Sequence, residues 1–304
     1  MSDRRNPILI PLLIIGIAIT SLILVMPFIV SGKVEAIPVS YYFEQNIPEH
    51  KPHHADNAFS VMTLNIGHGR GASLHQLIQS RAGIKTNTDV IDKVIIREQI
   101  DIAALQEVDG PGFWNGGLDL IEHLAENSGM PHGIWTRNVE TVALSYGTAL
   151  LSDLPYSQAD SYTFKARPFI LPKGFTAGLF KISEHSDTHI CVISLHLAPL
   201  LPQMRRLQVR AVMEVLKDID YPLVICGDFN TGWKDNSAVK QMVDGLNLKA
   251  WKPEEKGLGT HHTGSRRLDW ILISEDLEFT DYIVLGEKLS DHSAVKAVIR
   301  HAEG

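Results

Sequence analysis

Acidic, amide and histidine side chains stand at the ends of apolar runs that read as strands. They are Asn65, Glu107, His196, Asp228, Asn230, Asp269, Asp291 and His292. Functional residues of α/β proteins gather where strands end, so we expect these side chains to lie close together. No cysteine belongs to the set, and no serine nucleophile elbow accompanies it.

The composition of this set indicates metal-assisted chemistry on phosphoesters. Carboxylate and amide oxygens suit a hard cation such as Mg²⁺ or Mn²⁺, whereas zinc usually recruits more nitrogen or sulfur. A histidine beside an aspartate suits a general base that is held in one tautomer. A cation that neutralises phosphate charge and an Asp–His pair that activates water together describe phosphoester hydrolysis.

The elements that must position these side chains alternate as in an α/β domain. Strands are predicted over 58–66, 100–108, 147–152, 178–183, 189–197, 221–230, 268–274 and 293–300. Helices are predicted over 88–99 with Thr88 as the N-cap, over 117–129 with an end near Gly129, and over 203–219. No repeat or linker interrupts this stretch, so we predict one domain over residues 58–302.

Seven short motifs follow one another along this domain. They are TLN ending at Asn65, LQE ending at Glu107, GTALLS over 147–152, SLHL around His196, GDFN over 227–230, RLDWIL around Asp269 and SDH ending at His292. Their order and spacing resemble the endonuclease/exonuclease/phosphatase superfamily, which includes pancreatic-type deoxyribonuclease and the neutral sphingomyelinases. The resemblance covers residues 58–300 and implies a four-layer α/β/β/α sandwich of two mixed sheets.

The resemblance implies a divalent cation, Mg²⁺ or Mn²⁺, and its ligands. Glu107 is the implied principal ligand, Asn65 lies beside it on metal or phosphate, and Asp291 is a metal or outer-sphere ligand. Two positions depart from well-known relatives. Gly67 stands where several nucleases have another acid, and Asp153 replaces an arginine that follows the LLS strand, which fits poorly with a polyanionic substrate.

The resemblance also implies the catalytic roles. His292 is the general base, and Asp269 orients its far ring nitrogen. Asp228 positions or activates the attacking water. Asn230 donates a hydrogen bond to the phosphate, and His196 donates to a phosphate oxygen and stabilises the charge of the transition state.

Further residues are candidates for substrate binding. The loop 65–71 holds three glycines with His68 and Arg70, and the backbone N–H groups of such a loop can bind phosphate. Tyr146 precedes the GTALLS strand, while His262 and Arg267 belong to the loop 259–267. The alternatives are a flexible turn for the first loop and an exposed loop for the last.

Residues 8–30 carry no charge, and 18 of these 23 are Ala, Val, Ile, Leu, Met or Phe. As a helix they would span roughly 35 Å, enough to cross a bilayer. Because Arg4 and Arg5 precede them, we expect a single-pass anchor over residues 1–30 with the catalytic domain on the extracytoplasmic side. A cleaved signal peptide and a buried helix are the alternatives. Residues 31–57 hold three prolines and no visible period, so we predict a linker.

Charge and cysteine content narrow the choice of partner. The chain has a net charge of −7, and without the anchor's one acidic and two basic residues the remainder carries −8. This acidity disfavours long-range attraction to nucleic acid. The anchor favours a lipid head group or small phosphoester, with an exported nuclease and a catalytically silent binding domain as the alternatives. The sequence carries no signal for an oligomeric state.

Two cysteines exclude a disulfide scaffold, and Cys191 and Cys226 are expected in buried strands as a pair or as free thiols.

Overall fold

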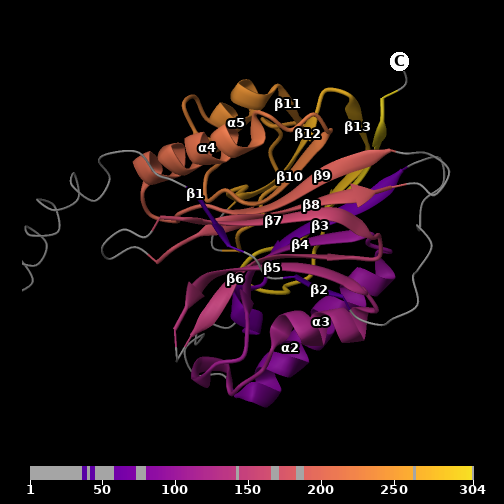
Figure 1. Ribbon diagram of the computed structural model, residues 1–304, viewed down its shortest axis with the longest axis vertical. Coiled ribbons are helices and arrows are strands. Elements are labelled where there is room, and N and C mark those ends of the chain that lie inside the picture. Colours follow the sequence, from indigo (N-terminus) through magenta and orange to yellow (C-terminus); the bar gives the residue numbers. More distant parts are fainter. Residues whose placement is uncertain are drawn as a thin grey trace, which may run out of the picture.

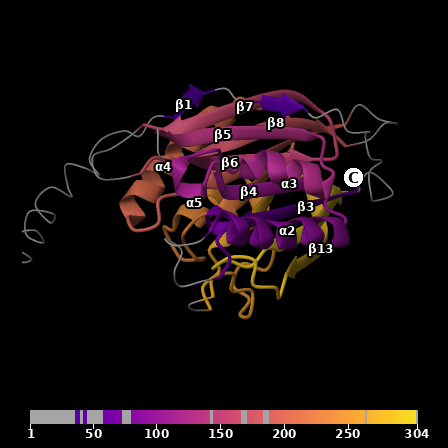
Figure 2. The same cartoon turned by 90° about the horizontal axis from the view of Figure 1, so that it is seen from below.

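Two seven-stranded sheets lie face to face, with helices on their outer faces (Figures 1 and 2). This computed structural model describes residues 36–39, 42–44, 58–72, 80–141, 144–165, 171–182, 188–262 and 265–302. The proposed anchor over residues 1–30 lies outside these ranges. Within them, no helix is both long and apolar enough to span a bilayer.

The first sheet holds β9 and β10 as a central parallel pair, and its other neighbours are antiparallel. Its strand order is β1 (Ala36–Val39), β7 (Tyr156–Phe164), β8 (Gly174–Lys181), β9 (His189–His196), β10 (Leu223–Asp228), β12 (Asp269–Ser274) and β11 (Leu248–Ala250). Helices α4 (Pro202–Leu216) and α5 (Ala238–Leu246) pack on its outer face.

The second sheet repeats this plan with β3 and β4 as its parallel pair. Its strand order is β13 (Leu277–Val284), β14 (Val295–His301), β3 (Phe59–Asn65), β4 (Ile102–Asp109), β6 (Ser145–Ser152), β5 (His132–Glu140) and β2 (Tyr42–Glu44). Helices α2 (Arg81–Arg97) and α3 (Leu120–Ser128) cover its outer face. Two short 3₁₀ turns, η1 (Gly67–Gly69) and η3 (Phe113–Asn115), follow β3 and β4.

Three apolar clusters separate four layers, which confirms the sandwich of two mixed sheets between helices. One cluster lies under each pair of helices and the third lies between the sheets. Successive strand residues face opposite sides, so Cys191 packs under α4 while Cys226 packs between the sheets. Both are free thiols, because side chains on opposite faces of a sheet cannot form a disulfide.

The structure differs from the sequence expectations mainly at polar elements. Helix α2 begins at Arg81 with Ser80 as its N-cap, and Thr88 lies inside the helix, where its hydroxyl donates to the Ile84 carbonyl. Strands β5, β7, β11 and β13 and helix α5 had not been predicted. Strands β1 and β2 lie within the segment expected to be a linker and extend one edge of each sheet. Edge pairing relies on backbone hydrogen bonds, so it leaves little trace in side-chain pattern.

Candidate active site

The carboxyl ends of the two central strand pairs meet on one side of the sandwich. In the first sheet, Asp228 at the end of β10 is the register partner of His196 on β9 and of Asp269 on β12. In the second sheet, Asn65 at the end of β3 pairs with the residue before Glu107 on β4. The backbone therefore brings five of the expected residues together before any side chain is considered.

A β-bulge turns Glu107 out of its strand. Ala103 and Leu105 face the core under α2 and α3, and Val108 rather than Glu107 takes the next place in that core. The register with β6 shifts here, and Glu107 has a φ of +55°. A non-glycine residue in this region costs about 1–3 kcal/mol and is usually found where a side chain must be aimed.

The Glu107 carboxylate lies among three nitrogen groups. Its Oε1 is 3.1 Å from Nζ of Lys173 and 3.9 Å from Nε2 of His196, and its Oε2 is 3.4 Å from Nε2 of His68. Burial alone would raise the pKa of Glu107, but the charges of Lys173 and then of His68 hold it far below its ordinary value. The carboxylate is therefore ionised at any physiological pH.

His68 is fixed by a second acid of the same strand. Its Nδ1 lies 2.6 Å from Oδ1 of Asp109, and its ring meets the edge of the Tyr146 ring at 4.9 Å. Burial lowers the pKa of His68, but the hydrogen bond to Asp109 and the charge of Glu107 raise it overall. Burial and the same two acids also raise the pKa of Tyr146, which keeps its hydroxyl protonated.

An acid–imidazole–acid relay lies beside this group. Nδ1 of His292 is 2.7 Å from Oδ2 of Asp269, and Nε2 of His292 is 3.9 Å from Oδ2 of Asp228. The hydroxyl of Thr260 donates to the same oxygen of Asp269, which fixes that carboxylate. The side chain of Asp269 is fully buried, so it can orient His292 without itself reaching solvent.

The pKa values of His292 and Asp228 in the relay are raised, whereas that of the neighbouring His196 is lowered. Burial lowers the pKa of His292, yet the charges of Asp269, Asp228 and Asp291 raise it to about 10. Burial, followed by the Asp269 charge, raises the pKa of Asp228. Burial, followed by the Lys173 charge, lowers the pKa of His196 well below its ordinary value. His196 is therefore neutral, and a neutral imidazole has one N–H to donate.

Both expected amides hold Asp228 in place. Asn65 donates from Nδ2 to Asp228 Oδ2 at 3.1 Å and accepts from the Gly67 backbone N–H. The backbone N–H of Asn230 donates to Asp228 Oδ1 at 2.8 Å, while its side-chain amide donates to the carbonyl of Leu197. Asn230, expected to donate to phosphate, thus uses one amide hydrogen within the protein.

The carboxylates of this region can accommodate a divalent cation. Oδ2 of Asp109 and Oδ1 of Asp269 are buried and have no hydrogen-bond partner among the described residues. Ligand atoms of Asp228, Asp269 and His292 lie within 4.8 Å of one another, as do those of His261, Asp291 and His292. Buried oxygens with unused lone pairs suit a hard cation, and the ionised Glu107 adds a further oxygen donor nearby.

Three residues expected to bind substrate have other positions. The Arg70 guanidinium stacks 3.7 Å over the Trp114 ring. The Arg267 guanidinium donates to the Trp251 and Lys252 carbonyls and to the Tyr282 hydroxyl. His262 is exposed on its loop. The stacked and buried positions of the two arginines arise because guanidinium groups pack well on aromatic rings and satisfy several carbonyls at once.

Three residues of the site were not among the expected ones. Lys173 precedes β8, Asp109 lies two residues after Glu107, and Thr260 holds Asp269. Within the loop 259–267, which was expected to hold phosphate, the ring of His261 lies 5.0 Å from the ring of His292. The QEVD sequence was a usable signal for Asp109. No sequence pattern marks Lys173, because its proximity to Glu107 depends on how the two sheets pack.

Asp153 does not bear on the site. Asp153 directly follows the last residue of β6. Its backbone N–H donates to the carbonyl of Asp101, which directly precedes the first residue of β4. The site lies at the other end of β6, at Tyr146, roughly 20 Å away along an extended strand. The expectation that Asp153 would disfavour a polyanionic substrate was therefore wrong.

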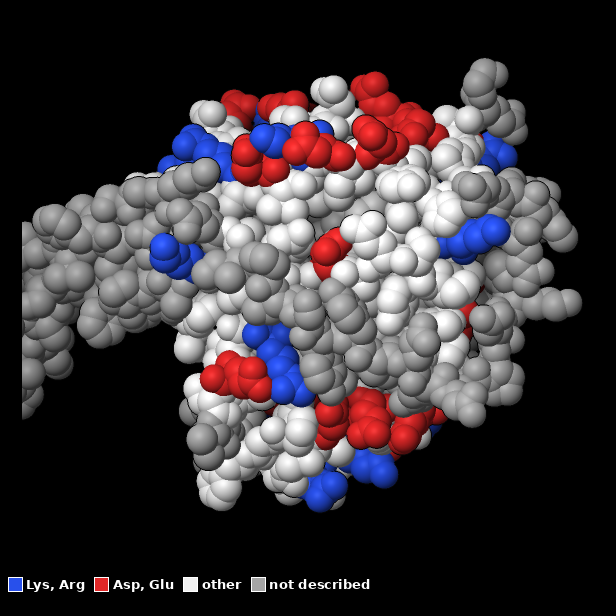
Figure 3. Space-filling view, viewed as in Figure 1, with Lys and Arg blue, Asp and Glu red and all other residues white. Residues whose placement is uncertain are grey.

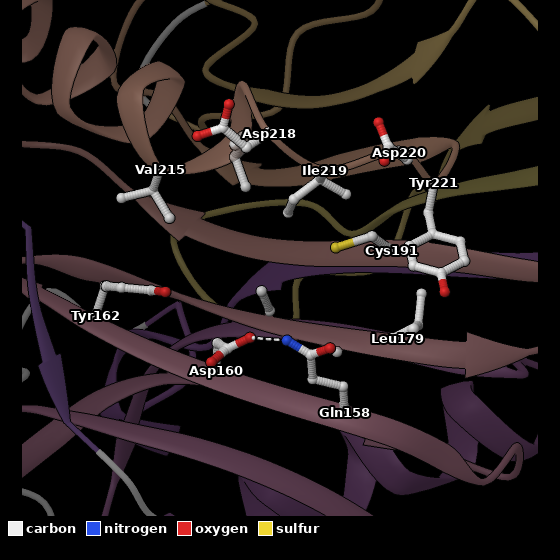
Figure 4. A pocket seen from close by; sticks show the side chains of 13 residues that line it. Gln158, Asp160, Tyr162, Leu179, Cys191, Val215, Asp218, Ile219, Asp220 and Tyr221 are labelled. Atoms are coloured by element: carbon white, nitrogen blue, oxygen red, sulfur yellow. Dashed lines mark hydrogen bonds between the residues drawn. The ribbon is translucent and has the colours of Figure 1, made fainter.

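A pocket of about 420 Å³ lies away from this site, on the outer face of the first sheet (Figure 4). Strands β7, β8 and β9 form its floor, and residues 215–221 at the end of α4 form its wall. Asp160, Asp218 and Asp220 supply its charge. None of the expected site residues lines this pocket. The active site is therefore located by its cluster of acidic and histidine side chains and not by this pocket.

Comparison with known proteins agrees with the geometry. The model described as "Endonuclease/Exonuclease/phosphatase family" matches residues 62–292. No curated protein sequence matches the chain. Similar solved structures include an endonuclease/exonuclease/phosphatase family protein from Bacteroides thetaiotaomicron, with 17% identity, a TM-score of 0.66, and coverage of 84% of this chain and 100% of that one.

Two further structures have named activities or ligands. A mannosyl-6-phosphatase from Bacteroides thetaiotaomicron has 17% identity and a TM-score of 0.63, with 79% of this chain and 99% of that chain covered. The human Nocturnin catalytic domain with bound sulfate has 18% identity and a TM-score of 0.59, with 88% and 98% covered. At such identities the likeness shows the fold alone.

Proposed function

The chain belongs to the endonuclease/exonuclease/phosphatase family, whose members are hydrolases of phosphoester bonds, and we propose that it hydrolyses a lipid or small phosphoester with a divalent cation. The observation that carries the proposal is the relay Asp228–His292–Asp269. It lies beside an ionised Glu107 that is surrounded by Lys173, His68 and His196. Such a site holds a proton acceptor, anion-binding groups and cation ligands together.

The protein's own groups account for the proton transfers and for phosphate binding. Nε2 of His292 takes a proton from water as the water oxygen attacks phosphorus, and Asp269 holds the resulting imidazolium. Asp228 faces the same Nε2 and orients the water. The neutral His196 donates its Nε2–H to a phosphate oxygen, where negative charge grows, and the leaving oxygen takes a proton from solvent.

Glu107, Asp291 and the Asn65 amide are the proposed donors to the cation. When bound, a divalent cation such as Mg²⁺ or Mn²⁺ would neutralise the phosphate and part of the carboxylate charge that raises the pKa of His292. The carboxylate-rich donor set favours these hard ions over zinc.

The proposed substrate is small or a lipid head group, and surface charge supports this choice. The chain carries a net charge of −7. On the face shown in Figure 3, acidic and basic side chains intermingle over α4 and α5, and no continuous basic band crosses the described part of that face. Extended nucleic acids are bound chiefly by cationic surfaces. The structurally similar mannosyl-6-phosphatase supports a small phosphoester on this fold.

A panel of phosphoesters tests the proposal. The purified chain in Mg²⁺ or Mn²⁺ is expected to hydrolyse bis-nitrophenyl phosphate, nitrophenyl phosphate or phospholipid vesicles, and EDTA is expected to abolish turnover. Turnover of the diester or the monoester separates phosphodiesterase from phosphatase activity. Faster nicking of plasmid DNA than release of lipid phosphate would establish the nuclease alternative. The absence of turnover with any divalent cation would contradict the enzyme assignment and favour a silent binding domain.

We propose further that residues 1–30 anchor the enzyme in a membrane with its catalytic domain outside the cytoplasm. The support is the uncharged stretch 8–30 behind Arg4 and Arg5. A C-terminal reporter that is active only outside the cytoplasm is expected to give signal, and deletion of residues 1–30 is expected to abolish that signal. Activity of a cytoplasm-only reporter at the same position would refute the orientation.

A further inference from the structure

Two acids and a histidine meet between the helices that cover the second sheet. Helices α2 and α3 lie side by side on its outer face (Figure 2). Asp89 and Asp92 stand one turn apart on α2, so they share a face of that helix. His123 stands opposite on α3. None of the three belongs to the proposed active site.

Their side chains converge on one point. Nε2 of His123 lies 2.7 Å from Oδ1 of Asp89, and one ligand atom from each of the three residues lies within 4.8 Å of the other two. The side-chain amide nitrogen of Asn127 donates to the His123 carbonyl at 2.6 Å and lies 3.0 Å from Nδ1 and 3.4 Å from Nε2 of the His123 ring.

Asp92 has no partner for its charge in the part of the chain that the structure describes. The residue is 3% exposed, and both of its carboxylate oxygens are buried without a hydrogen bond among the described residues. A buried, unpaired carboxylate costs several kcal/mol, and such groups are normally paired or bound to a metal.

We infer that Asp89, Asp92 and His123 form a second cation site, separate from the active site, which binds a divalent transition metal such as Zn²⁺. One imidazole nitrogen and two carboxylate oxygens suit Zn²⁺, whereas Mg²⁺ prefers oxygen ligands alone. Tetrahedral ligands at 2.0–2.1 Å from a metal lie about 3.3 Å apart. The cation therefore replaces the proton shared by His123 and Asp89 and widens their contact by roughly half an ångström.

The site is accessible and ties two helices together. The Asp89 side chain is 41% exposed, so a cation can enter from solvent and keep water as its fourth ligand. Because its ligands come from both α2 and α3, a bound cation adds a cross-link to the native state only. Binding to the native state alone stabilises a protein by mass action.

Zinc titration of active-site variants tests the inference. Glu107→Gln is used as the background because it weakens cation binding at the active site. The Glu107→Gln chain is expected to bind one more equivalent of Zn²⁺ in equilibrium dialysis than Glu107→Gln/Asp92→Asn. At a Zn²⁺ concentration about 100 times Kd, Tm is expected to rise by about 5 °C only when Asp92 is present.

Two controls separate cation binding from folding and from catalysis. Asp244→Asn, at an exposed position on α5, is expected to keep the zinc response of its parent. Asp92→Asn alone is expected to retain full phosphoester hydrolysis and, in EDTA, a Tm no lower than that of the natural chain, since it removes an unpaired buried charge. Equal zinc stoichiometry and equal Tm shifts with and without Asp92 would overturn the inference. So would the absence of any zinc effect on either chain.

Discussion

Replacement of His292 by alanine is expected to lower kcat for phosphoester hydrolysis by about 10²–10⁴-fold, the usual contribution of a positioned general base. Nε2 of His292 is the nitrogen that faces Asp228, while Nδ1 is bound to Asp269 at 2.7 Å. Loss of the ring removes the proton acceptor but leaves Glu107 and its neighbours in place. We therefore expect KM to change much less than kcat when both are measured under saturating Mg²⁺ or Mn²⁺.

Asp269→Asn tests the same base. It is expected both to shift the pH–rate profile and to lower the rate. The Asp269 charge raises the pKa of His292, which lies at about 10 in the cation-free protein. Removing that charge lowers this pKa, so the neutral, proton-accepting ring forms at lower pH. The acid limb of the pH–rate profile is expected to move to lower pH, while the plateau falls because the ring loses its orientation. An unchanged acid limb, or full activity of His292→Ala, would exclude His292 as the base.

The layers of the fold could be predicted because buried strands and amphipathic helices leave a pattern in the sequence. The central strands β3, β4, β9 and β10 are continuous apolar runs that end in polar residues. Both the apolar runs and the polar residues at their ends could be recognised in the sequence. Strand β7 carries half-buried polar residues over most of its length, so no alternation marked it. The start of α2 was missed because Ser80 is an N-cap eight residues ahead of the periodic apolar stretch.

The candidate site also includes residues that the sequence could predict and residues that it could not. Residues at strand ends, such as Glu107 and Asp228, were found because register brings the ends of neighbouring strands together. Lys173 and Thr260 were not found, since their positions depend on loops that return to the site from elsewhere in the chain. Arg267 was expected to bind substrate because it is a cation in the loop 259–267, but its guanidinium packs against the rings of Trp270 and Tyr282.

Glu107→Gln is expected to lower metal-dependent turnover by at least about 10³-fold. A cation that polarises a phosphoryl oxygen contributes several kcal/mol to the transition state, and each 1.4 kcal/mol is tenfold in rate. The pKa of Glu107 is held far below its ordinary value by the charges of Lys173 and His68, against the effect of burial. Its charge is therefore present at every pH of interest, and the amide cannot recover it at high pH.

The Glu107→Gln substitution also removes the carboxylate that pairs with Lys173. Its effect on stability can therefore be measured separately from its effect on catalysis. The Lys173 side chain is 9% exposed and its Nζ lies 3.1 Å from Glu107. Leaving that ammonium unpaired is expected to cost about 1–3 kcal/mol in the free energy of unfolding. Adding Lys173→Met is expected to restore much of the lost stability in urea unfolding, because it removes the unpaired charge, but none of the activity. If Glu107→Gln kept its Mg²⁺-dependent turnover, or if the double variant regained it, Glu107 would not be the principal cation ligand.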